Sequence, residues 1–340
     1  MNSADVFLDV SVVLCTYNPR RQILEHTLRG LREQTLDQAR WELIIVDNAS
    51  SENEKPTEEL LHGIRNATII HEAKPGLTNA RLCGIRSAKG LILVFVDDDN
   101  VLASNYLQVA FELAQKNPAW GAFGGKVIGV FEKPLPQTLR PFEGYLACRN
   151  LPIDEFILTK QHLTKTHFGS VAKYLPLGAG LVLVKPAIQQ ILRVLEQRSQ
   201  IVFSDRIGKD SLACGADYEM SLILLTTDWN VAYTNQLSLD HLIASFRTSE
   251  DYLAKLVFEA KRTWVFLTSI YNVCPWNSIH PSTKWFRMIR SYFKLRAWKG
   301  GSERLNWKGS CGVCSAQAEL VGFRRCNEHV IRQVAELNHG

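Results

Sequence analysis

The chain has 340 residues, of which 46% are hydrophobic and 21% are charged, and its formal net charge is +5. These proportions are ordinary for a globular protein, and no tract is biased enough to predict a disordered arm. No stretch approaches the ~20 apolar residues that a membrane-spanning helix needs, and residues 1–15 lack the basic region and apolar core of a secretion signal. The composition therefore predicts a cytoplasmic protein with a full hydrophobic core.

Apolar runs, turn residues and helical patterns alternate through the first third of the chain, which is typical of a parallel sheet flanked by helices. We expect strands at residues 10–15, 43–46, 67–71, 91–96 and 121–130. One helix is expected to follow an Asn18 cap with Pro19 in its first turn, and others at residues 77–88 and 104–113. The order of elements predicts an α/β fold.

The later part of the chain is predicted to be irregular at first and then helical. Residues 132–174 are rich in proline and polar side chains and predict long loops with short elements. We expect a strand at 177–184, helices at 185–195 and 217–225, and a short strand at 231–233. Beyond Ser249 the pattern is mainly helical, which predicts a main domain at residues 1–248 and a helical extension at 249–340.

Three consecutive aspartates, Asp97, Asp98 and Asp99, follow the most apolar predicted strand, LILVFV. The carboxyl ends of parallel strands form the ligand-binding edge of an open α/β sheet. Because alternate residues of an extended tip point the same way, Asp97 and Asp99 can converge on one Mg²⁺ or Mn²⁺ ion. A solvated turn or a helix cap is the structural alternative, but the buried strand that leads into the cluster favours a functional site.

Seven segments occur in the order found in one enzyme family. SVVLCTYNP, IIVDNASSE, GLTNARLCGI and FVDDDN fall within about the first 105 residues, and GAGLVL, GADYEM and HLIASFR extend to about residue 250. With these segments the chain resembles the family 2 glycosyltransferases, which have the GT-A fold, a Rossmann-like and mostly parallel sheet. The resemblance implies that the main domain is catalytic.

The resemblance further implies that a sugar moves from a nucleotide-diphosphate donor, most often a UDP-sugar, with inversion at the anomeric carbon. The cofactor would be Mn²⁺ or Mg²⁺. The acceptor would be a glycan, a lipid-linked sugar or another hydroxyl compound, as in polysaccharide biosynthesis. The sequence identifies neither the sugar nor the linkage.

Individual residues take roles from the same resemblance. The donor nucleotide and its diphosphate would be bound by Thr16, Asn18, Asp47, Arg81, Asp98 and Arg247. The metal would be held by Asp97, Asp99 and His241. Asp217 would accept the proton of the acceptor hydroxyl, since Ala216 replaces the first of two acids common in the family, and Glu219 could substitute for it.

Ordinary structural roles are open for each of these residues. Thr16, Asn18 and Asp47 are good cap and turn residues, and Arg81 could lie on a helix surface. A lone histidine such as His241 is usually structural, and an acid at a helix N-terminus is favoured by the helix dipole. Gly178 and Gly180 allow close approach of the backbone to a sugar, or form a bend that enters a strand.

Two other functions stay open. DDDNVL also matches the D-x-D-x-[TV]-L pattern of haloacid-dehalogenase-like phosphatases, which use the first aspartate as nucleophile, although that motif normally follows the first strand. A catalytically silent module that only binds nucleotide or glycan is the second, because Asp217 lacks an acidic neighbour. A dinucleotide-dependent oxidoreductase is disfavoured, since CTYNP stands where that class has a glycine-rich turn.

The cysteines allow one metal hypothesis. Cys311, Cys314, Cys326 and His329 could close a tetrahedral zinc site, but GSCGVCSAQAELVG also predicts a helix of small residues, which we favour. Reduced thiols are expected at the dispersed cysteines Cys15, Cys83, Cys148, Cys214 and Cys274.

Residues 284–299 (KWFRMIRSYFKLRAWK) combine six Lys and Arg with five aromatic residues and contain no acid. Helical spacing of their apolar residues predicts an amphipathic helix. We expect this helix to pack against the main domain, and the alternative is peripheral contact with the inner face of a membrane, where a lipid-linked acceptor would be found. No nucleic-acid-binding module surrounds the segment, so nucleic acid is not an expected partner.

Overall fold

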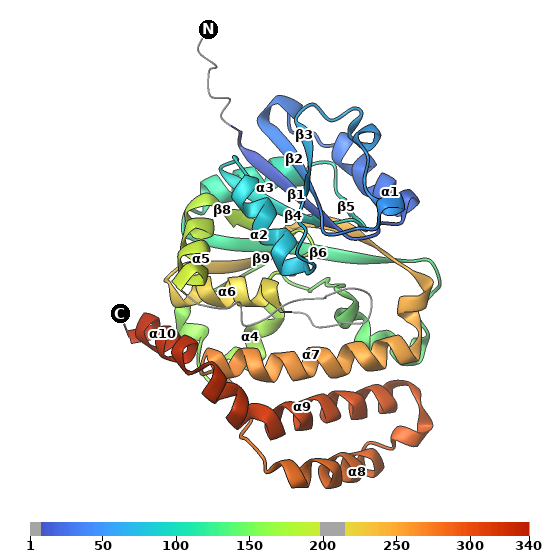
Figure 1. The fold of residues 1–340 in the computed structure, drawn as a ribbon, viewed down its shortest axis with the longest axis vertical. Helices are drawn as coiled ribbons and strands as arrows, with labels where there is room; N and C mark the ends of the chain where they lie inside the picture. The colour runs from blue at the N-terminus through green and yellow to red at the C-terminus, as the bar shows by residue number, and fades with distance from the viewer. Residues whose placement is uncertain (1–7, 198–214, 340) are drawn as a thin grey trace.

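The computed structural model of the chain describes residues 8–197 and 215–339 (Figure 1). The predictions made for residues 1–7 and for Cys214 lie outside this part. Figure 1 shows a twisted sheet with its helices in the upper part of the molecule and a stack of long helices in the lower part.

Within the described residues, the strands form one nine-stranded sheet in the order β3-β2-β1-β4-β8-β6-β9-β5, with β7 paired to β9. Four strands run parallel in its first half, namely β1 (Val10–Thr16), β2 (Trp41–Asp47), β3 (Ala67–His71) and β4 (Ile92–Asp97). The second half is mixed and contains β5 (Asn100–Leu102), β6 (Trp120–Phe131), β7 (Glu155–Leu158), β8 (Val182–Val184) and β9 (Asn230–Ile243). Most paired residues lie in parallel pairs, so the predicted α/β fold with a mostly parallel sheet is confirmed.

The apolar runs of the first strands explain their central position. Every residue of β1 and β2 is buried, as expected when helices cover both faces of a parallel sheet. The helices of this region are α1 (Arg21–Arg32), α2 (Leu77–Ser87) and α3 (Tyr106–Lys116). Gly84 lets α2 lie close to the sheet, because a Cβ at this position would overlap with the side chain of Val13 on β1. The position of α2 bears on function, since α2 carries Arg81.

The start of α1 differs from the prediction. Arg20 is the N-cap and the helix begins at Arg21, so the prediction that Asn18 caps the helix and Pro19 lies in its first turn is wrong. Asn18 instead adopts a left-handed conformation with φ of 46°. Its Oδ1 accepts a hydrogen bond from the backbone N–H of Ser51 at 2.8 Å, so the side chain joins the loops that follow β1 and β2.

Three strands of the second half also differ from the prediction. β9 is much longer than the expected strand at 231–233, because β6, β7 and β5 all pair with it, and His241 therefore lies within this strand rather than after it. β8 is shorter than expected, since residues 177–181 form a turn before it. The short β5, immediately after the aspartates, was not predicted.

The region at 132–174 consists of long loops with short elements, as predicted. It contains β7, the 3₁₀ helices η4 (Gln137–Leu146), η5 (Lys160–His162) and η6 (Ala172–Tyr174), and α4 (Phe168–Val171). Shorter 3₁₀ helices occur earlier, at η1 (Gln38–Arg40), η2 (Glu52–Glu54) and η3 (Glu58–Leu61). Two helices follow, α5 (Lys185–Gln197) and α6 (Ala216–Thr226), close to the predicted bounds.

The last part of the chain is helical, as predicted. Its longer helices are α7 (Glu250–Ile270), α8 (Lys284–Lys294), α9 (Gly301–Cys326) and α10 (Glu328–His339). Short 3₁₀ helices connect them, at η7 (Ser245–Thr248), η8 (Pro281–Thr283) and η9 (Ala297–Lys299). Figure 1 shows α7, α9 and α8 stacked in that order away from the sheet. None of the described helices combines the length and apolarity needed to cross a bilayer.

The zinc hypothesis is wrong for the described residues. Cys311 and Cys326 lie on one continuous helix, α9, so 15 residues of helix separate them by about 22 Å. Among residues 8–197 and 215–339 no three His, Cys, Asp or Glu side chains are placed to hold a metal. The dispersed cysteines Cys15, Cys83, Cys148 and Cys274 are free thiols, as predicted.

The expectation that the amphipathic segment packs against the main domain is also wrong. α8 packs on α9, and Met288 is the only buried residue within it. Its large apolar side chains remain exposed, including Trp285 and Phe286.

Candidate active site

The carboxyl ends of β1, β2 and β4 lie side by side at one edge of the sheet. The register pairs Thr16 of β1 with Asp47 of β2, and Cys15 of β1 with Asp97 of β4. Because these strands are parallel and adjacent, residues far apart in the sequence meet at this edge. The site is built from this edge and from segments that β9 and α6 bring to it.

Asn100 holds in place the three aspartates at the end of β4, Asp97, Asp98 and Asp99, which we call the aspartate tip. Its Oδ1 accepts the backbone N–H of Asp97 at 3.1 Å, and its Nδ2 donates to Asp99 Oδ1 at 3.1 Å. Thr27 Oγ1, on α1, donates to the carbonyl oxygen of Asp98 at 3.0 Å. Asn100 is fully buried, so these bonds fix the turn from the inside while the three aspartates remain partly accessible.

Asp99 lies beside a histidine and an arginine. Its Oδ2 is 3.3 Å from His241 Nε2 and 3.0 Å from Arg247 Nη1. His241 reaches this position because β9 pairs it with Asn100, and Arg247 follows β9 in η7. The buried atoms His241 Nδ1 and Arg247 Nε have no hydrogen-bond partner in the described part of the chain. Buried polar atoms without a protein partner are uncommon and are typical of ligand-binding sites.

A second cluster joins Asp97 to the turn before β8. Arg81 of α2 is buried, and its Nη2 lies 3.7 Å from Asp97 Oδ1. The same guanidinium group lies against the backbone of Gly178, where a Cβ atom would overlap with it. The Gly178 N–H donates to Asp217 Oδ2 at 2.8 Å, and the Tyr218 N–H donates to Asp217 Oδ1 at 3.0 Å. Arg81, Asp97 and Asp217 therefore belong to one connected group.

Asp98 is directed toward β1 rather than toward the two clusters. Thr16 Oγ1 donates to Asp98 Oδ2 at 2.5 Å. Burial raises the pKa of the Asp98 carboxyl to about 7, and the negative charge of Asp99 adds to this increase, whereas the bond from Thr16 opposes it. Asp98 thus supports the tip through Thr16.

Asp47 is buried at the end of β2, with 1% of its surface exposed. Its Oδ2 lies 2.9 Å from His71 Nδ1, whereas its Oδ1 has no hydrogen-bond partner among the described residues. A buried carboxylate oxygen without a donor is costly unless a ligand supplies one. This position fits an acceptor for the N–H of a nucleotide base.

Several residues that shape the site were not predicted from the sequence. Asn48 fixes the loop before α2, since its Nδ2 donates to the carbonyl oxygens of Glu72 and Lys74 and its Oδ1 accepts the N–H of Gly76. Glu132 joins Arg20 to the backbone N–H of Ser245, two residues before Arg247. Asn48 directly follows Asp47, and that adjacency was the only available signal.

Asp99 Oδ2 and His241 Nε2 are donor atoms of the kinds that bind a divalent cation, but Arg247 Nη1 lies 3.0 Å from the first and 3.2 Å from the second and would have to move aside for an ion to contact both. A carboxylate oxygen and a neutral imidazole nitrogen are ordinary metal ligands, and these two lie 3.3 Å apart. Asp97, the third predicted ligand, lies by Arg81 instead. Because the described residues hold no group of three such ligands, water and donor phosphate would complete the coordination. The three-residue metal site stays a prediction.

Comparison with known proteins agrees with this geometry. Residues 11–171, which include β1 to β4 and all three aspartates, match the family model for glycosyl transferase family 2. This segment makes up just under half of the chain and is similar to that family, and curated proteins named as glycosyltransferases or as polysaccharide biosynthesis proteins match parts of the chain. The matched segment covers the DDDNVL motif, so it argues against the phosphatase interpretation.

Individual relatives match shorter segments. The chain is 26% identical over 134 residues to the UDP-Glc:alpha-D-GlcNAc-diphosphoundecaprenol beta-1,3-glucosyltransferase WfgD of Escherichia coli. This alignment covers 37% of the chain and 51% of WfgD. The chain is also 28% identical over 123 residues to the succinoglycan biosynthesis protein ExoM of Rhizobium meliloti, in an alignment that covers 34% of the chain and 38% of ExoM. The matches thus span about half the length of these relatives or less. A crystal structure of S. aureus TarS aligns over 97% of this chain and 55% of TarS, with a TM-score of 0.49 and 13% identity.

Substitution of Gly178 by alanine is expected to lower catalytic efficiency by about tenfold or more, because the added Cβ displaces the Arg81 guanidinium from Asp97. Steady-state kinetics with a nucleotide-sugar donor would measure the effect. Gly144→Ala is a matched control, since nothing lies within 4 Å of the added atom. Equal kcat/KM values in the two variants would contradict the contact between Arg81 and the turn.

Proposed function

We propose that the chain transfers a sugar from a nucleotide-diphosphate donor to a hydroxyl acceptor, with a divalent metal and with inversion at the anomeric carbon. The observation that carries this proposal is the position of Asp47, Asp97 and Asp217 at one edge of the sheet. Asp47 and Asp97 end the two strands that flank β1, and Arg81 and Gly178 connect Asp97 to Asp217. One group would bind the base, the second the diphosphate with its metal, and the third the acceptor.

A uridine nucleotide fits the proposed donor site. Asp47 Oδ1 is a buried acceptor without a protein donor, and a base with an N–H, such as uracil, would supply one. The name of WfgD specifies a UDP-glucose donor, which supports the same class for this chain. Thr16 and Asn18 lie at the end of the adjacent strand and in the loop after it, where they would position the nucleotide.

Departure of the diphosphate requires stabilisation of the negative charge that develops on it. A bound Mg²⁺ or Mn²⁺ held by Asp99 and His241 would supply Lewis-acid stabilisation. Arg247 and Arg81 add two guanidinium groups on the same edge, next to Asp99 and Asp97. Preorganised positive groups of this kind act where charge develops.

Asp217 is proposed as the base. Two backbone N–H groups orient its carboxylate, and each oxygen keeps a second lone pair that can accept a proton from an acceptor hydroxyl. Direct attack of that hydroxyl on the anomeric carbon would invert its configuration. Glu219 is a weaker candidate, since it is buried, with 4% of its surface exposed.

The acceptor is proposed to be a lipid-linked sugar or a growing polysaccharide. The names of WfgD and ExoM specify a diphosphoundecaprenol-linked substrate and a role in succinoglycan biosynthesis, respectively. A cytoplasmic reaction, at the membrane surface or away from it, stays a prediction.

Incubation of the purified chain with several nucleotide sugars and Mn²⁺ tests the proposal. We expect slow release of nucleoside diphosphate from one donor, faster when an acceptor sugar is added, and loss of the activity with a chelator. Release of phosphate from phosphomonoesters would instead support the phosphatase. Nucleotide-sugar binding without turnover, with or without acceptor, would support the silent module.

A further inference from the structure

The surface of α8 is divided into three sectors. At about 100° per residue, Trp285, Phe286, Ile289 and Phe293 fall within one arc of about 100°. Arg287, Arg290 and Lys294 occupy the next arc. The remaining arc contains Met288 and Tyr292 and faces α9, where Trp307 Nε1 donates to the Met288 carbonyl oxygen at 3.0 Å. The apolar arc therefore lies beside the face that packs on α9 and is not covered by it.

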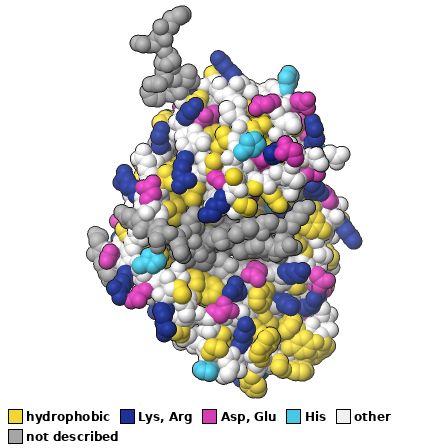
Figure 2. Space-filling model, viewed as in Figure 1, with side chains coloured by type: hydrophobic (Ala, Val, Ile, Leu, Met, Phe, Trp, Pro, Cys, Tyr) yellow, Lys and Arg dark blue, Asp and Glu magenta, His cyan; other side chains and the backbone are white. Residues whose placement is uncertain are grey.

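The apolar arc is exposed to an unusual degree. Trp285 and Phe286 are 69% and 70% exposed, and Ile289 and Phe293 are 58% and 63% exposed. Trp298 of η9 extends the patch, with its ring centroid 6.2 Å from that of Phe293. Figure 2 shows the hydrophobic side chains gathered at the lower end of the molecule, where Figure 1 places α8. Contiguous apolar patches of this kind mark interaction sites.

Positive charge surrounds the same patch. The segment from α8 to η9 carries Lys284, Arg287, Arg290, Lys294, Arg296 and Lys299, and it contains no acidic residue. None of these six cations makes an ion pair with a carboxylate in the described part of the chain. The positive charge is therefore available to an anionic partner.

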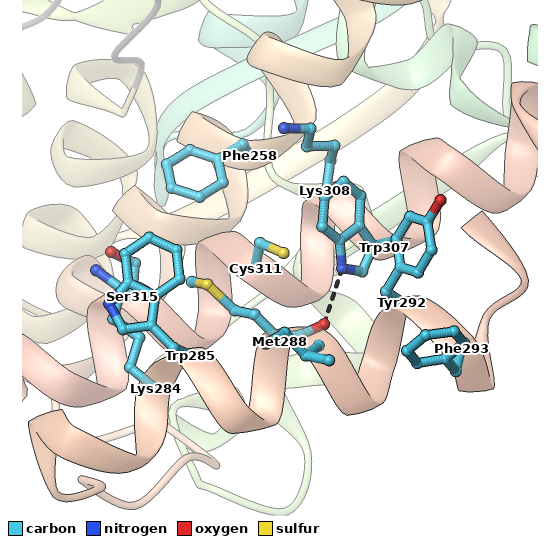
Figure 3. Close-up of a pocket in the computed structure, with 11 residues that line it drawn as sticks. Phe258, Lys284, Trp285, Met288, Tyr292, Phe293, Trp307, Lys308, Cys311 and Ser315 are labelled. Atoms are coloured by element: carbon cyan, nitrogen blue, oxygen red, sulfur yellow. Dashed lines mark hydrogen bonds between the residues drawn. The ribbon is translucent and has the colours of Figure 1, made fainter. Parts of the chain in front are cut away.

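A pocket of about 500 Å³ opens between α8 and α9 beside the patch (Figure 3). Its walls are largely apolar and include Trp285, Phe293, Phe258 and Trp307, and Lys308 also lines it. Because Trp285 and Phe293 belong both to the exposed arc and to the pocket, a hydrocarbon chain that contacts the arc can continue into the pocket. The volume and the lining suit an acyl chain.

We propose that α8 and η9 form a docking surface for a lipid bilayer that contains anionic lipids. The apolar arc enters the interface, tryptophan lies at the headgroup level, and lysine and arginine contact lipid phosphates. A second copy of this chain fits this surface less well, because self-association through it would bring two uncompensated sets of six positive charges together. The proposal does not depend on the chemistry at Asp99 or Asp217.

Co-sedimentation of the full chain with vesicles tests the proposal. We expect binding to phosphatidylcholine vesicles that contain phosphatidylglycerol, and about tenfold weaker binding to phosphatidylcholine alone. The combined variant Trp285→Ser, Phe286→Ser, Ile289→Ser and Phe293→Ser should weaken binding at least tenfold. The variant Arg287→Glu, Arg290→Glu and Lys294→Glu should do the same on anionic vesicles. Brominated acyl chains should quench the tryptophan fluorescence of the wild type.

Matched controls change exposed residues elsewhere. Leu91→Ser with Val321→Ser removes exposed apolar surface outside α8, and Lys116→Glu with Lys133→Glu reverses charge there, so both should bind vesicles like the wild type. Thermal unfolding would show that each variant is folded. Equal vesicle binding by wild type and the four-serine variant would overturn the proposal. A dimer in gel filtration that this variant dissolves, with no vesicle binding by the wild type, would overturn it in favour of a second copy.

Discussion

Replacement of Asp99 by alanine is expected to lower kcat of sugar transfer by about 10²–10³ or more. The carboxylate is the point where His241 and Arg247 meet, at 3.3 Å and 3.0 Å, so its removal takes away a proposed metal ligand and releases both partners. Loss of a single preorganised electrostatic contact at a developing charge typically costs this much. Donor turnover measured at saturating Mn²⁺, together with the Mn²⁺ concentration needed for half activity, would report the change.

Asp240→Asn is the matched control for this variant. Asp240 precedes His241 on β9, but its side chain is exposed. This substitution removes one carboxylate from the same strand and should leave turnover close to that of the wild type. If Asp99→Ala retained full turnover, the site on the β4 tip would have to be abandoned.

The second large effect is expected at Asp217. Asp217→Asn keeps the size of the side chain but removes the base, so transfer should fall by about 10²–10⁴ while donor binding changes little. The readouts are the transfer rate with acceptor present and the donor dissociation constant from calorimetry. Separation of the two effects is what distinguishes a base from a residue that only supports the fold.

Two comparison variants sharpen this test. Asp228→Asn alters an exposed acid just after α6 and should be active. Glu219→Gln tests the weaker candidate for the base, and its thermal unfolding must be measured because the side chain is buried. Normal transfer by Asp217→Asn with loss of transfer by a folded Glu219→Gln would reassign the base to Glu219.

The first half of the fold could be predicted because its signals are local. The apolar runs of β1 to β4 and the helical spacing of α2 identify these elements without knowledge of their neighbours. The aspartate tip could be predicted from a local signal as well, since the most apolar predicted strand leads directly into it. Motif order then predicted the resemblance to family 2 glycosyltransferases, which the family-model match over residues 11–171 confirmed.

The rest depends on pairing between distant segments. Arg247 lies 148 residues from Asp99, and the two meet only because β9 extends to Ile243 with partners on both sides. The contact of Arg81 with Gly178 likewise needs the turn before β8, which the apolar pattern at 177–184 hid within a longer predicted strand. The exposed side of α8 could not be found from periodicity, because periodicity shows that a helix has an apolar face but not what covers that face.

α7 begins three residues beyond Arg247. Ser249 is the N-cap of this helix and accepts the Tyr252 N–H, while Glu250 accepts the Gly301 N–H and pairs with Arg304 of α9. Arg247, whose guanidinium group contacts Asp99, therefore lies next to the N-terminus of α7, where α7 is bonded to α9. A shortened chain that ends at residue 248 would lose these contacts along with the helices, so we expect the helical region to stabilise the edge of the sheet that carries the candidate site.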